Sequence, residues 1–340
     1  MRDNVLGLHA VVAMDVDNDT VASVRTGCTT RKNVAGYDFT GLLCGAEGTL
    51  GVVTQATLRV WPIPGCCAAG RLSFATLTAA ARAVAELLAI GVDVVRCELL
   101  DAASVRAFRT VQQQPTSSSS SSSSHKEVEE EEGDTLEEVP TLFLELQAPT
   151  ETILREQMDM VNDSIGSFPE MRRAKWATGV ADRQALWKAR HSLYHAAIAS
   201  RPGATSALVT DACVNLSHLP SLLEATAADV RTAGLVGPCF GHAGDGSFHC
   251  ILPVSIETDT DEYWDRVHWV NHNLLQRTLA VGGTVTGEHG IGTGKRKYLE
   301  QQYGPGAIHM MRAIKRALDP HGLFNPGKVL DVEVEEQYNT

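Results

Sequence analysis

Alternating apolar and polar positions predict two short strands near the start of the chain. Residues 5–13 and 20–26 are rich in branched apolar side chains, and a polar Asp/Asn segment separates them, as in a β-hairpin. A glycine-punctuated stretch, 33–54, and a β-rich run follow. Pro62 and Pro64 then interrupt the pattern, because proline fixes φ and lacks an amide donor. We therefore predict a domain boundary at this double proline.

From Leu72 onward, helical and strand periodicities alternate. Helical patterns cover residues 77–90, 151–163, 181–199, 217–232 and 262–280. Strand patterns cover residues 92–99, 141–148, 206–214, 236–241 and 247–254. This alternation predicts a helix-covered sheet, in an α+β or split-βαβ domain.

One segment inside this region cannot form a packed core. Eight consecutive serines, Ser117 to Ser124, precede a block from His125 to Val139 that holds eight acids and one base. Such a composition buries too little apolar surface to offset its ordering entropy. We predict a disordered loop over residues 113–139. A regulatory phosphorylation tract is the alternative to a plain insertion.

Charge and apolar content exclude several classes. The net charge is −12, but outside the acidic block 28 bases face 33 acids, a balance of only −5. A nucleic-acid binder would usually carry a basic stripe, so we expect no nucleic-acid partner. No apolar run approaches the roughly 18–20 residues of a transmembrane helix. The first residues have neither a signal-peptide nor a transit-peptide pattern, so we expect no targeting segment in this chain.

Cysteine spacing gives no metal or disulfide framework. The eight cysteines are scattered and form no Cys-x-x-Cys pair. In a chain of this length they indicate thiols in a reducing compartment. A cysteine-based zinc or iron–sulfur site is therefore not expected.

Two glycine-framed loops concentrate chemically capable side chains. In the first, His242 and His249 flank a Gly-Asp-Gly turn; in the second, Glu288 and His289 are adjacent among glycines. Together they offer two nitrogens and one oxygen to a divalent cation, with one histidine left over. Purely structural histidines are the alternative.

Nucleotide-binding motifs are absent from the glycine-rich loops. The P-loop spacing fails because His289 stands where its first glycine should be and Arg296 follows Lys295. Gly-x-Gly-x-x-Gly also fails, which removes the main support for a nicotinamide dehydrogenase on a Rossmann domain. Arg190, in a helical pattern, is either a solvated helix residue or a carboxylate-binding arginine.

Five motifs occur together and in order. They are Ala35-Gly-Tyr-Asp-Phe-Thr-Gly-Leu, Gly45-Ala-Glu-Gly-Thr-Leu-Gly, Gly241-His-Ala-Gly-Asp-Gly-Ser-Phe-His, Gly287-Glu-His-Gly-Ile-Gly and Asn325-Pro-Gly-Lys. This set resembles the FAD-linked 2-hydroxy-acid dehydrogenases of the vanillyl-alcohol-oxidase superfamily (FAD-binding oxidoreductases of type 4). The D-lactate dehydrogenase (cytochrome) branch is the most similar, also through Arg201-Pro-Gly and the apolar Ile251.

The resemblance implies a role for each candidate residue. Backbone at Glu47, Gly48, Thr49 and Gly51 would line the nucleotide portion of FAD, and Asn325 would approach the isoalloxazine. His242, His249 and Glu288 would bind a divalent metal, zinc or manganese. His289 would be the general base, and Arg190 would clamp the substrate carboxylate.

The implied reaction is oxidation of a D-2-hydroxy acid, most of all D-lactate to pyruvate, with hydride passing to flavin N5. Electrons would then pass to cytochrome c or another acceptor, in mitochondria. The implied fold is α+β: the C-terminal remnant of a VAO/PCMH-type FAD-binding domain (1–64), a ferredoxin-like cap or substrate domain (65–281), and a segment returning to the flavin (282–335).

Several departures keep other hypotheses open. The family places a flavin-binding half before the segment corresponding to Met1, so we expect a truncated chain. Ser247 stands where the family usually has asparagine, and Asn215 where proline is usual. The alternative hypothesis is a catalytically silent homologue that acts as a binding or regulatory subunit or is a fragment. A metal-dependent hydrolase using the His/His/Glu set is a third.

Overall fold

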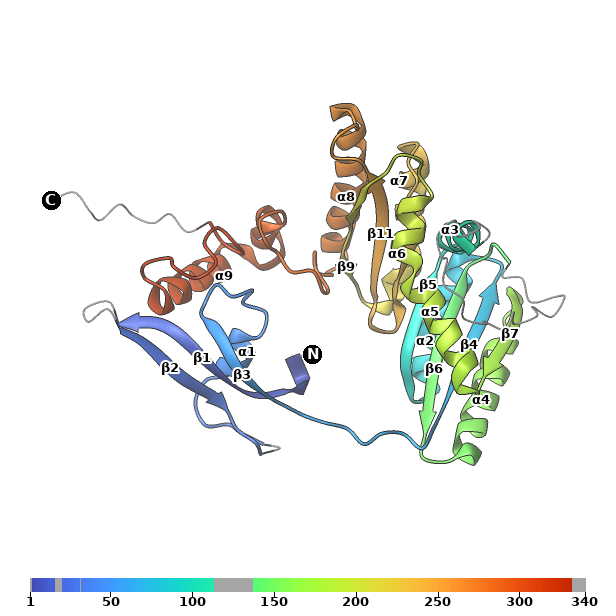
Figure 1. Ribbon diagram of the computed structural model, residues 1–340, viewed down its shortest axis with the longest axis horizontal. Helices are drawn as coiled ribbons and strands as arrows, with labels where there is room; N and C mark the ends of the chain where they lie inside the picture. The colour runs from blue at the N-terminus through green and yellow to red at the C-terminus, as the bar shows by residue number, and fades with distance from the viewer. Residues whose placement is uncertain (1, 16–19, 31, 113–136, 332–340) are drawn as a thin grey trace, which may run out of the picture. The chain divides into compact units, whose positions relative to one another are not determined.

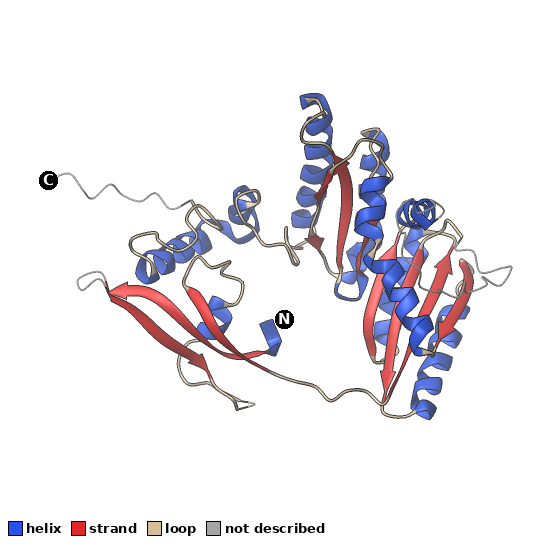
Figure 2. Cartoon of the chain, viewed as in Figure 1, coloured by secondary structure: helices blue, strands red, loops and turns tan. Residues whose placement is uncertain are grey.

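The computed structural model describes residues 2–15, 20–30, 32–112 and 137–331 (Figures 1 and 2). The chain divides into two compact units: the first combines Met1–Ile63 with Val285–Thr340, and the second is Pro64–Thr284. Most of the predicted loop, from 113 to 136, lies outside the described residues.

The first unit is a small antiparallel sheet with helices against it. Its strands are β1 (Val5–Asp15), β2 (Thr20–Gly27) and β3 (Val52–Leu58), in the order β2-β1-β3. Its helices are α1 (Phe39–Leu43) and α9 (Arg296–Leu318), which both contact β1. The predicted hairpin of β1 and β2 is confirmed. Buried Leu8, Ala10 and Val12 alternate along β1, as strand geometry requires for one covered face.

The second unit is built on one long sheet. Its strands are β4 (Cys66–Phe74), β5 (Val94–Leu100), β6 (Thr141–Ala148), β7 (Met171–Ala177), β8 (Ser206–Val209), β9 (Ala212–Cys213), β10 (Cys239–His242) and β11 (Ser247–Val254). The order is β7-β4-β6-β5-β10-β11-β8, and β9 pairs with β11 off this path. Its helices are α2 (Leu77–Ala89), α3 (Ala102–Gln112), α4 (Glu151–Gly166), α5 (Val180–His191), α6 (Leu193–Ala199), α7 (Leu219–Thr232) and α8 (Asp261–Ala280).

The connectivity of this unit confirms the predicted α+β, ferredoxin-like class. The segments β4-α2-β5 and β6-α4-β7 place their strands in the order β7-β4-β6-β5, with antiparallel neighbours. The sheet then continues through β10, β11 and β8. The continuous helix predicted over 181–199 is wrong, because the structure has two helices, α5 and α6, on either side of Ser192.

Side-chain alternation along β6 creates two separate cores. Leu142, Leu144 and Leu146 pack with α2, α4, α7 and α8, whereas Phe143 packs with α3, α5 and α6. Successive strand residues point to opposite faces, so the sheet is covered by helices on both sides (Figure 2). In the described part of the chain, no helix is long and apolar enough to span a membrane.

Candidate functional site

Three polar residues share one face of three adjacent strands in the second unit. Leu100 on β5, Phe240 on β10 and Ile251 on β11 all belong to the core under α3, α5 and α6. Glu98, His242 and His249 stand two residues from them on the same strands, so they face the same side of the sheet. The three polar side chains therefore lie next to this apolar core, on the same face of the sheet.

Strand register brings Glu98 and His242 together. The two residues are direct cross-strand partners on β5 and β10, and Glu98 Oε1 lies 2.6 Å from His242 Nδ1. Glu98 is 6% exposed. This buried carboxylate was missed by the sequence analysis, because a single acid between Cys97 and Leu99 in a strand carries no motif.

The ring of His249 is also held through its Nδ1, in this case by a backbone carbonyl group. It pairs with Phe240 across β10 and β11, and its ring centroid lies 6.2 Å from that of His242. Its Nδ1 lies 2.9 Å from the carbonyl oxygen of Thr210. A carbonyl only accepts, so Nδ1 is the donor and Nε2 is the nitrogen that a metal would use. The side chain of Asp211 is fully buried, with Oδ1 4.0 Å from the same Nδ1.

A tight turn joins the two histidine strands. The chain reverses through Ala243–Asp245 and Gly246, whose φ is +82°. A Cβ on Gly246 would lie 2.0 Å from the carbonyl oxygen of Val214, so only glycine fits here. The glycines of this motif therefore serve the hairpin that aligns His242 with His249.

Arg190 is neither solvated nor isolated. It lies near the end of α5, and its Nε and Nη2 both donate to Glu98 Oε2, at 3.0 and 2.9 Å. Its guanidinium carbon lies 4.6 Å from the centroid of the Phe240 ring. One carboxylate thus connects two residues that the sequence analysis selected for different roles, Arg190 and His242.

The surroundings keep Glu98 ionised. Burial raises the pKa of its carboxyl group, but the hydrogen bond from His242 and the charge of Arg190 outweigh burial and hold the pKa below its usual range. An ionised carboxylate accepts hydrogen bonds from both neighbours. Anchored imidazoles with an acceptor on Nδ1 are the arrangement that zinc and manganese ligands use, so these residues fit a divalent cation.

In the first unit, Glu47 ties together loops that are distant in sequence. Its carboxylate accepts the backbone N–H groups of Ile291 and Gly292 at 2.6 and 2.8 Å. The side-chain amide of Asn325 donates to the carbonyl oxygen of Glu47 at 2.5 Å. Glu47 itself has φ +53°. The Glu47 carboxylate therefore binds amides of this chain, and the backbone of Glu47 is the part that the resemblance predicts near FAD.

In the rest of the predicted flavin loop, some residues are open to a ligand and others contact this chain. Gly48 is exposed, and a Cβ added there would meet only the Asn325 amide, at 3.9 Å, so a ligand can approach this backbone closely. Thr49 is buried and donates to the carbonyl of Ala46, while a Cβ on Gly51 would meet the carbonyl of Val11 at 2.6 Å. Residues around Gly48 thus fit a tight backbone approach to FAD, and Thr49 and Gly51 support the loop.

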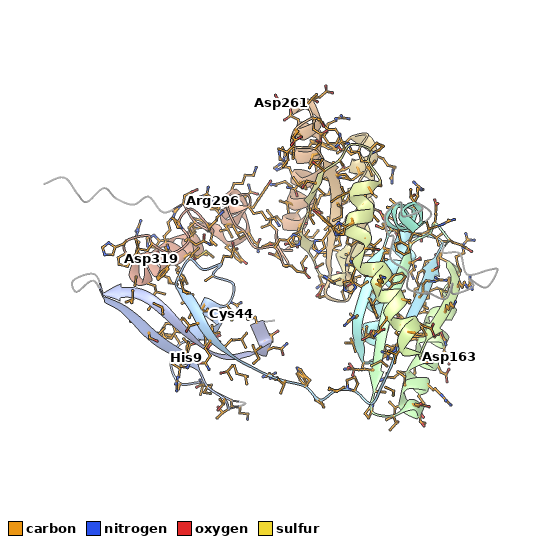
Figure 3. The ribbon with its side chains drawn as sticks, in the orientation of Figure 1. His9, Cys44, Asp163, Asp261, Arg296 and Asp319 are labelled. Carbon is orange, nitrogen blue, oxygen red and sulfur yellow. The ribbon has the colours of Figure 1, made fainter. Side chains whose placement is uncertain are left out.

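A buried lysine supports the same loop from α9. Lys315 donates to the carbonyl oxygens of Thr49 and Phe324, at 2.7 and 2.8 Å, and to the carboxylate of Asp319, which follows the end of α9 (Figure 3). The cavity beside it, about 240 Å³, is lined by Leu50 and Met311 among others. Lys315 was not selected from the sequence, because an isolated lysine carries no motif and is usually a solvated side chain.

Glu288 and His289 also lie in the first unit, and both are exposed. They precede Gly290, whose φ is +78° and whose added Cβ would lie 2.7 Å from a Glu47 carboxylate oxygen. Their loop is therefore anchored by Glu47. The predicted metal ligands come from both units, with His242 and His249 on the second and Glu288 on the first.

Comparison with known proteins identifies the family. Residues 67–329 match the family model described as "FAD linked oxidases, C-terminal domain". The chain is 38% identical over 98% of its length to "Probable D-lactate dehydrogenase, mitochondrial" of Danio rerio, covering 61% of that protein. It is 36% identical over 98% of its length to "D-lactate dehydrogenase [cytochrome], mitochondrial" of Arabidopsis thaliana, covering 53%. The chain thus spans little more than half the length of these relatives.

Solved structures agree on the fold. A crystal structure of p-cresol methylhydroxylase with substrate bound matches 96% of this chain and 65% of its own, with a TM-score of 0.69 and 16% identity. A 4-ethylphenol oxidase from Gulosibacter chungangensis matches with a TM-score of 0.63, also at 16% identity. The resemblance stated from the motifs is confirmed, and the chain belongs to the FAD linked oxidases, with their C-terminal domain over residues 67–329.

Proposed function

We propose that this chain supplies the substrate-binding and part of the flavin-binding machinery of an FAD-dependent D-2-hydroxy-acid dehydrogenase, with D-lactate as substrate. One observation carries the proposal most directly: His242 and Arg190 both bind Glu98, and His249 lies beside His242 on the same sheet face of the second unit. An imidazole pair beside a guanidinium suits an anionic substrate that also carries a hydroxyl group. The similarity to D-lactate dehydrogenases supports the choice of substrate.

The residues are assigned as follows. His242 and His249 bind a divalent cation, zinc or manganese, and Glu288 is retained as the third ligand on the sequence resemblance. A bound cation would supply Lewis acidity toward the substrate hydroxyl. Arg190 pairs with the substrate carboxylate, for which its planar fork is suited.

Proton transfer is assigned to His289, which takes the proton of the substrate hydroxyl as C2 is oxidised. Bound FAD would supply the two-electron acceptor. The backbone at Gly48 and the side chain of Asn325 face the cofactor, while Glu47 holds their loops. We further propose cytochrome c as the electron acceptor and mitochondria as the location, following the names of the relatives.

The visible spectrum of the purified chain tests the activity. After incubation with FAD and gel filtration, we expect retained flavin absorbance that bleaches on addition of D-lactate and not of L-lactate. Flavin that stays oxidised with D-lactate and other D-2-hydroxy acids would contradict the dehydrogenase and favour a silent binding subunit. Ester hydrolysis without flavin would favour a metal-dependent hydrolase.

Variants separate the proposed roles. His289→Ala should abolish bleaching and leave Zn²⁺ binding intact, whereas His249→Ala should lose Zn²⁺ binding as well. Arg190→Lys keeps the charge but loses the fork, so it should raise the D-lactate concentration needed for half-maximal bleaching rate. Arg106→Lys is the matched control, because Arg106 pairs with Glu138 on an exposed surface. Equal behaviour of the two arginine variants would remove Arg190 from the substrate site.

A further inference from the structure

We propose that Glu98 is a positioning residue that fixes which nitrogen of His242 carries the proton and holds Arg190 in place beside it. The proposal rests on the proposed function, because its purpose is to prepare a metal ligand and a carboxylate clamp. It adds a residue that neither the motifs nor the family resemblance singled out.

The first support is that the two oxygens of the Glu98 carboxylate bind different neighbours. Oε1 faces His242 Nδ1 at 2.6 Å, and Oε2 receives both Nε and Nη2 of Arg190, at 3.0 and 2.9 Å. Each oxygen therefore serves one neighbour. The carboxylate is almost wholly buried, and a buried charge is stable only when it is paired and hydrogen-bonded in this way.

The second support is the comparison with His249. There the Nδ1 partner is the carbonyl oxygen of Thr210, which has no proton to give, so the proton must lie on Nδ1. Glu98 offers His242 the same kind of acceptor, because Oε1 lies 2.6 Å from Nδ1 while the hydrogen bonds from Arg190 occupy Oε2. Both rings then present Nε2 in the form that binds a metal, and a carboxylate on the second nitrogen also raises ligand basicity.

The third support concerns Arg190. Its guanidinium is fixed by two hydrogen bonds to one oxygen and by the ring of Phe240, whose centroid lies 4.6 Å away. These contacts use the Nε edge and leave Nη1 outside the Glu98 bonds. The guanidinium is therefore held through its Nε–Nη2 edge, and the opposite fork, formed by Nη1 and the second N–H of Nη2, is assigned to the substrate carboxylate.

Glu98→Gln is the informative substitution because it keeps size and shape but introduces a donor. The amide oxygen will turn toward the Arg190 cation, which can only donate, so the amide NH₂ faces His242 Nδ1. Nδ1 must then accept, and the ring proton moves to Nε2. The nitrogen assigned to the metal is thereby blocked, while His249 stays unchanged.

The experiment uses the full chain labelled with ¹⁵N-histidine and free of metal. Long-range ¹H–¹⁵N spectra report the tautomer of each ring, and His242→Gln and His249→Gln assign the two signals. We expect Nδ1–H for both histidines in the wild type, and Nε2–H for His242 alone in Glu98→Gln. A wild-type His242 with its proton on Nε2 would overturn the proposal without any variant having to fold.

Calorimetric titration with Zn²⁺ gives the second readout. Loss of an outer-shell carboxylate typically costs roughly 10–100-fold in metal affinity, and we expect this loss in Glu98→Gln. Glu138→Gln is the matched control, because Glu138 pairs with Arg106 and Arg109 near the surface of the same unit. Unchanged affinity and unchanged tautomer in a folded Glu98→Gln chain would overturn the proposal.

The two readouts separate the two proposals. A wild-type chain that binds no Zn²⁺ contradicts the metal part of the proposed function, yet the tautomers still decide whether Glu98 sets the His242 ring. A Glu98→Gln chain that binds Zn²⁺ as well as the wild type leaves the metal site intact and removes Glu98 from it.

Discussion

The carboxylate of Glu47 accepts the backbone N–H of Gly292 at 2.8 Å, across 245 positions of sequence. With the bond to Ile291 it anchors the loop that carries Glu288 and His289. The carbonyl oxygen of Gly292 in turn accepts the N–H of Val329. One side chain from the beginning of the chain thereby organises two loops near its end.

Glu47→Gln should loosen this arrangement. An amide offers one acceptor oxygen, so one of the two backbone donors will face an NH₂ group and lose its partner. We expect a loss of about 1–3 kcal/mol in the free energy of unfolding. Hydrogen exchange at Ile291 and Gly292 should accelerate together, as measured by mass spectrometry. Glu300→Gln, an exposed change on α9, is the control; equal exchange in both variants would contradict the anchoring role.

Lys315→Met should destabilise the first unit strongly. It removes the cation that faces Asp319 and leaves a buried carboxylate without its ion pair. Breaking a buried pair from one side costs about 3–5 kcal/mol, which urea unfolding can measure. Lys315→Met combined with Asp319→Leu should recover part of this loss. A single variant as stable as the wild type would mean that the ion pair contributes nothing.

Asp101→Asn should change how stability depends on pH. Burial raises the pKa of Asp101 to about 6, above its ordinary value of 3.8. The folded chain therefore holds a proton that the unfolded chain releases, and wild-type stability falls as pH rises from about 4 to about 6. Asparagine can still accept the N–H of Ser104 at the start of α3 and carries no charge.

The variant should accordingly equal the wild type near pH 4 and exceed it by about 3 kcal/mol near pH 8. Urea unfolding at a series of pH values measures this difference. A difference that stays constant across the series would show that Asp101 does not titrate in this range.

Thiol reactivity should differ sharply between Cys28 in the first unit and Cys97 in the second. Hydrogen bonds from Thr30 lower the pKa of Cys28, whereas burial raises that of Cys97. Because the thiolate is the reactive form, iodoacetamide at pH 8 should label Cys28 well before Cys97. Peptide mass spectrometry follows both sites, and labelling in urea should remove the difference. Faster labelling of Cys97 in the folded chain would contradict the burial of its side chain.

Much of the secondary structure could be predicted because local patterns determine it. The strand 141–148 is confirmed to the residue, since its alternating apolar side chains serve two cores. β4 was not predicted, because Ala68, Ala69 and Gly70 give little strand signal and are selected by close packing. Gly70 shows this, since a Cβ there would lie 2.7 Å from the Trp176 ring.

Residues of the candidate site could be selected from the sequence only where a motif or the family resemblance indicates them. His242, His249 and Arg190 were selected from sequence, and the structure brings them together in one unit. Glu98 was not, because its importance comes from lying opposite His242 across two strands that are 144 residues apart in sequence. Pairing of this kind is decided by sheet order and register, which no local pattern contains.

The first unit combines residues 1–63 with residues 285–340, so its two segments are synthesised at different times. Residues 64–284 form a complete unit of their own, so they can fold while the ribosome is still adding later residues. Residues 1–63, in contrast, cannot complete their unit until the segment that begins at Val285 has been synthesised. A premature stop within α9 would therefore leave β10 and β11 intact but deprive residues 1–63 of the segment that completes their unit.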